Sequence, residues 1–247
     1  FGKLNWEILI YLVLTIASML TGYLDDASKN PWGEFKKGAL DLLIACLVAG
    51  TYLAFNGSEI FINILGESIV LNPIVFFILA VILVWVSINV TNCTDGVDGL
   101  SGTLSVITLF TIYLLESVKG TNSAINYITL ILIVCVLAYL WFNATPSKLM
   151  MGDAGSRALG IFISIAILKT GSPLLYIPVA LMLIIDGGLG LIKISFRRFL
   201  KIEILNNIRT PIHDQVRKRN DWSNTQVVFR FAIIQIIISF CVIYLIK

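Results

Sequence analysis

Long apolar runs separated by short polar segments dominate the pattern along this chain. No charged residue interrupts six of these runs, which are 8–24, 42–58, 68–94, 99–115, 120–147 and 231–246. Two further runs, roughly 154–168 and 173–192, are shorter and contain charged residues. Because about 20 mostly apolar residues suffice to cross a bilayer as a helix, the pattern predicts eight transmembrane helices.

The segment 59–72 has a different pattern from the spans on either side of it. β-Branched residues recur in 59–64 and again in 68–71, and Gly66 lies between the two stretches. Short β-rich runs joined through a glycine are typical of a hairpin. We therefore expect a short β-hairpin here, on the outer surface of the membrane.

Composition places the whole chain in a membrane. Of its 247 residues, 57% are hydrophobic and only 13% are charged. One soluble core of this length could not bury so much apolar surface. The prediction is an all-α polytopic membrane protein with the lipid bilayer as its solvent, organised as a single domain over residues 1–247.

The basic residues orient the predicted helices, because Lys and Arg near span ends are retained in the cytoplasm. If the loops 25–37, 91–98, 143–157 and 193–230 are cytoplasmic, they hold 14 of the 18 basic residues. Only Lys3, Lys119, Lys169 and Lys247 then lie outside, as do both chain ends. This bias accounts for the net charge of +3, so no nucleic-acid partner is predicted.

The four cysteines indicate neither a metal site nor a disulfide framework. Cys46, Cys93, Cys135 and Cys241 are scattered along the spans without a C-x-x-C spacing. Zinc sites and disulfide-rich folds both show closer cysteine patterns. We expect these side chains to serve in packing.

Acidic residues gather at three junctions between spans. Asp25 and Asp26 end the first span, Asp95 and Asp98 separate the third from the fourth, and Asp153 separates the fifth from the sixth. On the topology above, all five lie on one side of the membrane. A single Asp can simply cap a helix, but capping does not explain five acids at three junctions on the same side.

This placement separates the candidate function classes. An ion-coupled transporter would carry acids near the middle of its spans, whereas these acids lie at span ends. Clustered carboxylates facing water are typical of Mg²⁺ sites, where one or two carboxylates act together with substrate phosphates. Lys29, Lys37 and Lys148 lie near the acids, and the glycines of 95–99 and 152–156 allow backbone N–H groups to approach an anion. The pattern favours an enzyme of phosphoryl transfer.

Three of these segments resemble a known family. Gly-Tyr-Leu-Asp-Asp-Ala-Ser-Lys at 22–29, Asn-Val-Thr-Asn-Cys-Thr-Asp-Gly-Val-Asp-Gly-Leu at 89–100 and Met-Gly-Asp-Ala-Gly-Ser-Arg-Ala-Leu-Gly at 151–160 are similar to the three cytoplasmic signatures of the polyprenyl-phosphate N-acetylhexosamine-1-phosphate transferases. The resemblance covers essentially the whole chain. Thr94 and the Thr-Pro-Ile-His segment 210–213 are most similar to the branch that transfers phospho-N-acetylmuramoyl-pentapeptide. The alternative is the sister branch that uses UDP-GlcNAc.

The resemblance implies a reaction and its partners. Phospho-MurNAc-pentapeptide would pass from UDP-MurNAc-pentapeptide to undecaprenyl phosphate with Mg²⁺, which gives lipid I and UMP in peptidoglycan synthesis. The enzyme would lie in the bacterial plasma membrane, multi-pass, with its active site in the cytoplasm. Members of the family are often dimers, so a homodimer is an expectation from the resemblance alone.

The resemblance also implies roles for individual residues. Asp153 would be the principal Mg²⁺ ligand, and Asp25, Asp26 and Asp95 would surround the diphosphate and the lipid phosphate as catalytic residues. The remaining positions would bind substrate: Lys29 and Lys37 at phosphate oxygens, Asn92 and Asp98 at the nucleotide with Asp98 near uracil, Asn143 at a polar position near the site, Gly152 and Ser156 in the metal loop, and His213 over the site.

The chain departs from the family pattern at several positions. The run 213–215 is His-Asp-Gln where the family usually has three histidines, and Arg157 stands where an apolar residue is usual. Asp186 and Lys193 stand where Glu and Gln are usual. Family members generally carry ten spans, so the resemblance implies two further N-terminal spans that the sequence printed from Phe1 does not contain.

Overall fold

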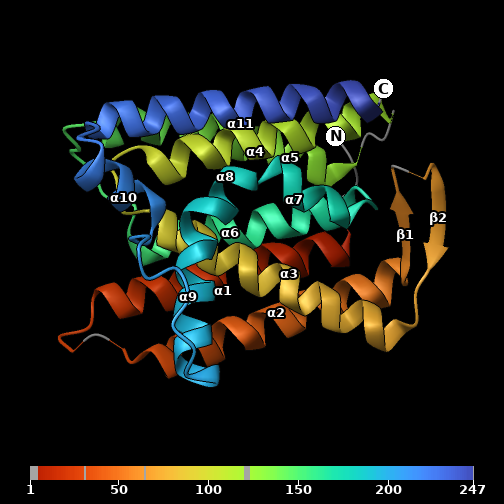
Figure 1. The fold of residues 1–247 in the computed structure, drawn as a ribbon. Helices are drawn as coiled ribbons and strands as arrows, with labels where there is room; N and C mark the ends of the chain where they lie inside the picture. The colour runs from red at the N-terminus through yellow and green to blue at the C-terminus, as the bar shows by residue number, and fades with distance from the viewer. Residues whose placement is uncertain (1–4, 31, 64, 120–122, 247) are drawn as a thin grey trace.

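The structure is a computed structural model that describes residues 5–30, 32–63, 65–119 and 123–246. Long helices lie side by side in one bundle (Figure 1), with a small hairpin at one end. The long helices are α1 (Trp6–Asp26), α2 (Glu34–Asn56), α3 (Pro73–Thr94), α4 (Leu100–Val118), α5 (Ala124–Asn143), α6 (Gly152–Lys169) and α11 (Asn224–Ile246).

Local sequence sets where several of these helices begin. The Asn5 side chain accepts a hydrogen bond from the Ile8 N–H at the start of α1. Asn72 does the same for Ile74 at the start of α3, where Pro73 occupies the first helical position. Such caps satisfy backbone donors that have no partner inside the helix. Outside these caps, the apolar runs themselves determine the helix interiors.

Helix α6 lies inside the bundle and packs against α1 and α3 over much of its length (Figure 1). Every residue from Leu159 to Leu168 is buried, whereas α5 and α11 expose many large apolar side chains. Exposed apolar surface of that extent fits a lipid environment. Helix α6 is therefore the element around which the others are arranged.

The predicted β-hairpin is present. Strand β1 (Glu59–Ile62) pairs antiparallel with β2 (Glu67–Val70), with Glu59 opposite Val70 and Ile62 opposite Glu67. The hairpin lies at the end of the bundle where α1 begins and α11 ends (Figure 1). We call this the hairpin end and the opposite end the site end.

The predicted span 173–192 is interrupted, which corrects the expectation of one continuous helix. The structure has η1 (Pro173–Leu175), α7 (Tyr176–Val179) and α8 (Leu181–Leu183), then the π-helical turn η2 (Ile184–Gly188), α9 (Leu189–Ser195) and the π-helical turn η3 (Phe196–Leu200). The two halves of this bent segment meet at 70°. Pro178 removes a backbone donor just before the break, which is a common cause of such kinks.

Gln235 of α11 satisfies the backbone groups that the break leaves without helical partners. Its side-chain oxygen accepts from the Met182 N–H at 2.9 Å, and its amide donates to the carbonyls of Pro178 and Val179 at 3.1 and 3.0 Å. Within a membrane each unsatisfied backbone group is costly. The broken helix is therefore held in place by its neighbour.

Six of the described helices, α1, α2, α3, α4, α5 and α11, have the length and apolar character to cross a membrane, and the bent segment makes a seventh. The one remaining predicted span, 154–168, falls in α6, whose 18 residues include Asp153, Arg157 and Lys169. These charged side chains pair with oppositely charged side chains of α1 and α2 inside the bundle. The start of the predicted span 120–147 and the predicted outside positions of Lys3 and Lys247 lie outside the described residues.

Helix α10 (Ile212–Arg219) is short and follows an irregular segment at the site end. Lys193 of α9 ties that segment down, because its ammonium group donates to the carbonyls of Leu205 and Ile208 at 3.1 and 2.9 Å. This arrangement presents His213, near the start of α10, to the site end of the bundle.

Candidate active site

The first and third acidic junctions of the sequence meet at the site end because α1 and α6 approach each other very closely. A Cβ built on Gly22 would lie 2.4 Å from the carbonyl oxygen of Asp153, so only glycine permits this approach. Gly22 lies one turn before Asp25 and Asp26. The close approach therefore brings the carboxylates at the end of α1 next to the start of α6.

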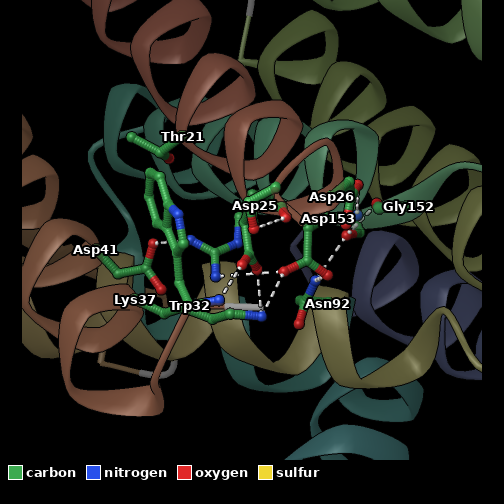
Figure 2. Close-up of polar contacts among 12 residues, drawn as sticks. Thr21, Asp25, Asp26, Trp32, Lys37, Asp41, Asn92, Gly152 and Asp153 are labelled. Carbon is green, nitrogen blue, oxygen red and sulfur yellow. Dashed lines mark hydrogen bonds and ion pairs between the residues drawn. The ribbon is translucent and has the colours of Figure 1, made fainter. Parts of the chain in front are cut away.

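Asp153 lies at the centre of the site, and its carboxylate is contacted from several elements (Figure 2). The Asn92 amide of α3 donates to its Oδ1 at 2.9 Å. On the other oxygen, Oδ2 lies 3.4 Å from the Lys37 ammonium of α2 and 3.5 Å from the Arg157 guanidinium. These contacts fix one orientation of the carboxylate. Asn92 also donates to the Ser156 hydroxyl at 2.9 Å, which in turn donates to the Gly152 carbonyl.

Asp25 is buried, with 5% of its surface exposed. Its carboxylate forms an ion pair with Lys37 and accepts a hydrogen bond from the Trp32 N–H at 2.8 Å. The Lys37 ammonium thus bridges Asp25 and Asp153 (Figure 2). A cation shared by two carboxylates of different helices offsets part of their mutual repulsion.

Asp26, by contrast, is exposed and caps the start of α6. Its Oδ2 accepts from the Asp153 N–H at 2.9 Å. Gly152, which precedes that N–H, has a φ of +65° and would bring a Cβ to 2.6 Å from the same oxygen. A carboxylate at a helix N-terminus is favoured by the free backbone donors and the helix dipole.

The three carboxylates form a potential cation site. One oxygen from each of Asp25, Asp26 and Asp153 lies within 4.8 Å of the others. Carboxylate oxygens are hard ligands of the kind that Mg²⁺ prefers. The donor set therefore fits the metal that the sequence predicts. The assignment of Mg²⁺ itself stays a prediction.

Asp95 lies beside this group, at the end of α3. The pKa of its carboxyl is raised to about 7, chiefly by burial and in smaller part by the nearby carboxylates of Asp153, Asp26 and Asp98, while a hydrogen bond from the Gly152 backbone lowers it. Perturbed carboxyl groups of this kind gather at functional sites. Burial and the neighbouring carboxylates together thus bring the titration of Asp95 near neutral pH.

Asp98 and Asn143 form a second polar group next to the first. The Asn143 oxygen accepts from the Gly99 N–H at 2.9 Å, and its amide donates to the Leu149 carbonyl at 2.8 Å. The Asp98 carboxylate accepts from the Ser147 N–H at 3.3 Å. These bonds tie the 95–99 loop to the segment between α5 and α6.

His213 is buried and faces the same loop. Asp186, in the π-helical turn η2, accepts from the His213 N–H at 2.7 Å, and its other oxygen lies 2.8 Å from the His213 Nδ1. A Cβ built on Gly96 would lie 2.4 Å from the His213 Nε2. The ring is therefore wedged between Asp186 and the 95–99 loop.

The structure brings most of the predicted site residues together at the site end and leaves one apart. Lys29 is exposed in the segment after α1, and its ammonium forms no ion pair with the described residues. The others are joined by the contacts above. Their roles in catalysis and binding stay predictions, since geometry alone does not test them.

Sequence reasoning missed three contributors: the Trp32 N–H, Asp41 and the partnership of Asp186 with His213. Asp41 of α2 is 1% exposed and pairs with Arg157 at 2.9 Å. An acid at the edge of an apolar run is a usable signal, and Asp41 directly precedes the predicted span 42–58. A backbone donor such as Trp32 carries no signal in the sequence.

Comparison with known proteins places the chain among relatives of one kind. The model of glycosyl transferase family 4 matches residues 8–171. A Treponema pallidum (strain Nichols) protein named phospho-N-acetylmuramoyl-pentapeptide-transferase is 38% identical over 244 residues, covering 92% of this chain and 67% of the relative. A protein of the same name from Wolbachia pipientis wMel is 26% identical over 249 residues, covering 96% and 76%. One from Borrelia garinii is 36% identical over 109 residues, covering 44% and 30%.

Proposed function

The chain belongs to glycosyl transferase family 4, and we propose that it transfers phospho-MurNAc-pentapeptide from UDP-MurNAc-pentapeptide to undecaprenyl phosphate. The products are lipid I and UMP, and the reaction requires Mg²⁺. The names of the relatives support this assignment of substrate. In this reaction a lipid phosphate oxygen forms a bond to the β-phosphorus of the donor. The bond from that phosphorus to the bridging oxygen breaks, and UMP leaves with the electron pair.

One observation carries the proposal: the carboxylates of Asp25, Asp26 and Asp153 converge from two helices at one end of a membrane bundle. A reaction between two phosphate-bearing substrates must overcome their mutual repulsion. Mg²⁺ held by these carboxylates would supply positive charge to the diphosphate. A carboxylate cluster at a helix end, rather than inside the bundle, suits a soluble donor and a membrane acceptor at once.

The residues around the cluster have distinct tasks in this proposal. Lys37, which bridges Asp25 and Asp153, neutralises developing charge on the phosphate oxygens. Asn92 and Ser156 hold the Asp153 carboxylate and the metal loop in place. Asp95 lies close to the reacting phosphates.

A second group binds the substrate. Asp98 and Asn143, which tie the 95–99 loop to the segment between α5 and α6, orient the uridine, and the His213 ring packs against that loop at Gly96. Gly152 keeps the metal loop close to Asp26. Lys29 contacts phosphate from an exposed position.

Two routes connect these groups with product. In the direct route the lipid phosphate attacks the donor in line, and no residue needs to remove a proton, because a phosphate monoester with a second pKa near 6 is already largely ionised at neutral pH. In the covalent route an aspartate first takes up the phosphosugar. Release of UMP from the donor without any undecaprenyl phosphate, in an amount equal to the enzyme, would favour the covalent route.

The proposal includes a location. Several apolar helices indicate a multi-pass membrane protein, and we place it in the bacterial plasma membrane with the site end in the cytoplasm. Lys37 and Arg157 contact acids of the site, and Arg198 pairs with Glu34 at the start of α2, in agreement with retention of basic residues on the cytoplasmic side. A homodimer stays a prediction from the resemblance.

The test is Mg²⁺-dependent release of UMP by the purified protein in detergent. Undecaprenyl phosphate is supplied with either UDP-MurNAc-pentapeptide or UDP-GlcNAc, and Asp153→Asn is the control. UMP from the muramoyl donor alone, lost in the control, is the expected result. UMP from UDP-GlcNAc alone assigns the sister reaction, and release from neither donor by folded protein overturns the proposal.

A further inference from the structure

Arg157 places a guanidinium inside the bundle, one turn after Asp153 on α6. The residue is 3% exposed. Its NH1 lies 2.9 Å from the Asp41 Oδ1 of α2, and its NH2 lies 3.5 Å from the Asp153 Oδ2. We propose that Arg157, held by Asp41, is a positioning residue that orients the Asp153 carboxylate for the divalent cation. This inference rests on the proposed function.

The Asp41–Arg157 ion pair is a poor source of stability, which is the first reason for the proposal. Both Asp41 and Arg157 are almost fully buried, so forming the pair removes two charges from water. The Arg157 Nε is also buried and has no hydrogen-bond partner among the described residues. Apolar side chains of similar volume stabilise such positions as well as or better than a buried pair. A geometric role explains the pair better than stability does.

The second reason is the geometry around Asp153. Its Oδ1 is held by the Asn92 amide, and its Oδ2 lies between Lys37 and Arg157. Contacts on both oxygens fix the carboxylate rotation. Asp26 differs, because it is exposed and its only hydrogen bond among the described residues is to a backbone N–H. Of the carboxylates in the cluster, Asp153 is thus the one that several side chains orient.

The third reason is the shape of the guanidinium. Its planar fork presents separate N–H groups in fixed directions, so one side chain can contact two carboxylates at once. A lysine ammonium at the same position of α6 could pair with one of the two carboxylates, but it would not fix the position of one carboxylate relative to the other. Arg157 thereby links the position of Asp41 in α2 to that of Asp153 in α6. Residues that orient metal ligands typically affect metal affinity or activity by about 10- to 100-fold.

The test separates positioning from simple charge neutralisation. Arg157→Met alone leaves Asp41 buried and unpaired, so the decisive protein is the double variant Asp41→Leu/Arg157→Met, which removes both charges. Three quantities are measured in detergent: the melting temperature, Mn²⁺ affinity by electron paramagnetic resonance, and kcat for UMP release. We expect a melting temperature near that of the wild type, together with about a 10- to 100-fold loss in Mn²⁺ affinity and in kcat.

A matched control lies at the other end of the same helix. Lys169 of α6 pairs with the buried Glu7 of α1 at 2.9 Å. The double variant Glu7→Leu/Lys169→Met removes a largely buried ion pair without touching the site, and its Mn²⁺ affinity should equal that of the wild type. An Asp41→Leu/Arg157→Met protein with Mn²⁺ affinity and kcat within threefold of the wild type overturns the inference.

A second variant decides the matter if the double variant does not fold. Arg157→Lys keeps the charge opposite Asp41 and should fold, with Mn²⁺ affinity at least fivefold weaker than the wild type. Wild-type affinity in that protein overturns the inference. The metal readout also separates the two proposals: if the wild type binds Mn²⁺ but releases no UMP, the transferase assignment fails while the role of Arg157 is still measured.

Discussion

Helices α1 and α6 are joined at both ends, but the two junctions are built differently. At the hairpin end, the Lys169 ammonium lies 2.9 and 3.0 Å from the two Glu7 oxygens and donates to the Asn56 oxygen at 2.7 Å. At the site end, the junction consists of the Asp26 carboxylate on the Asp153 N–H. The first junction matches a cation with an anion, whereas the second brings two carboxylates together.

The comparison teaches what separates a structural polar cluster from a functional one. At the hairpin end the charges cancel and the amide of Asn56 donates to Glu7 at 2.6 Å. At the site end, Asp25, Asp26, Asp95 and Asp153 gather, and the cations that contact them among the described residues are Lys37 and Arg157. A surplus of one sign destabilises the free protein and creates affinity for an oppositely charged ligand.

The largest expected effect is that of Asp153→Asn, which tests whether the acids at the site end serve function and not stability. We expect kcat for UMP release to fall about 10³-fold, because the site loses a carboxylate ligand of the Mg²⁺ that would stabilise developing negative charge. The melting temperature should stay within about 3 °C of the wild type, since Lys37 still pairs with Asp25 and Arg157 still pairs with Asp41. UMP assays and thermal melts of the same preparation measure both. Retention of more than a tenth of the activity would contradict the role of Asp153.

The opposite result is expected at the hairpin end for Glu7→Gln. Lys169 then loses its charged partner in a largely buried place, which should lower the free energy of unfolding by about 2 kcal/mol. Turnover per folded molecule and the Mg²⁺ concentration for half activity should stay unchanged. Unfolding in mixed detergent and UMP assays at several Mg²⁺ concentrations test this. A change in Mg²⁺ dependence would show that the two ends are coupled.

The raised pKa of Asp95, caused mainly by burial and also by the neighbouring acids, should appear as a pH dependence of stability. Asp95 keeps its proton up to about pH 7 in the folded protein, whereas the ordinary carboxyl loses it near 3.8. Between these values the folded state binds more protons than the unfolded state, so the contribution of Asp95 to stability is lost as pH rises from about 4 to about 7. Asp95→Asn should flatten this part of the profile. Melting temperatures from pH 4 to 8 in EDTA measure it, and an unchanged slope would contradict the raised pKa of Asp95.

The smallest effect is expected for Lys29→Met. An exposed ammonium contributes about 0–1 kcal/mol to an ionic contact, so KM for the donor should rise by less than about fivefold. The difference should vanish at high salt because exposed charges are screened. Steady-state kinetics at low and high ionic strength provide the measurement. A loss comparable to that of Asp153→Asn would mean that Lys29 is drawn into the site when substrate binds.

Much of the fold was readable from the apolar pattern. The long helices, the hairpin at 59–72 and the shared location of the three acidic segments all follow from run length and from the sidedness of basic residues. The break at Ala180 was not predicted, because its cost is offset by Gln235, a polar residue of another helix. The interior position of α6 was not predicted either, since its charges find partners only after the bundle has formed.

The sequence by itself determined which segments enter the membrane and which ends of those segments carry acid, because burial of apolar surface and backbone hydrogen bonding are local to each run. Only the tertiary structure decided which acids are paired. Asp41 is neutralised by Arg157 and Glu7 by Lys169, whereas Asp26 keeps its charge and accepts a hydrogen bond from a backbone N–H. These partners are separated by at least 116 residues along the chain, and Coulomb energy depends on distance in space, which the order of residues does not specify.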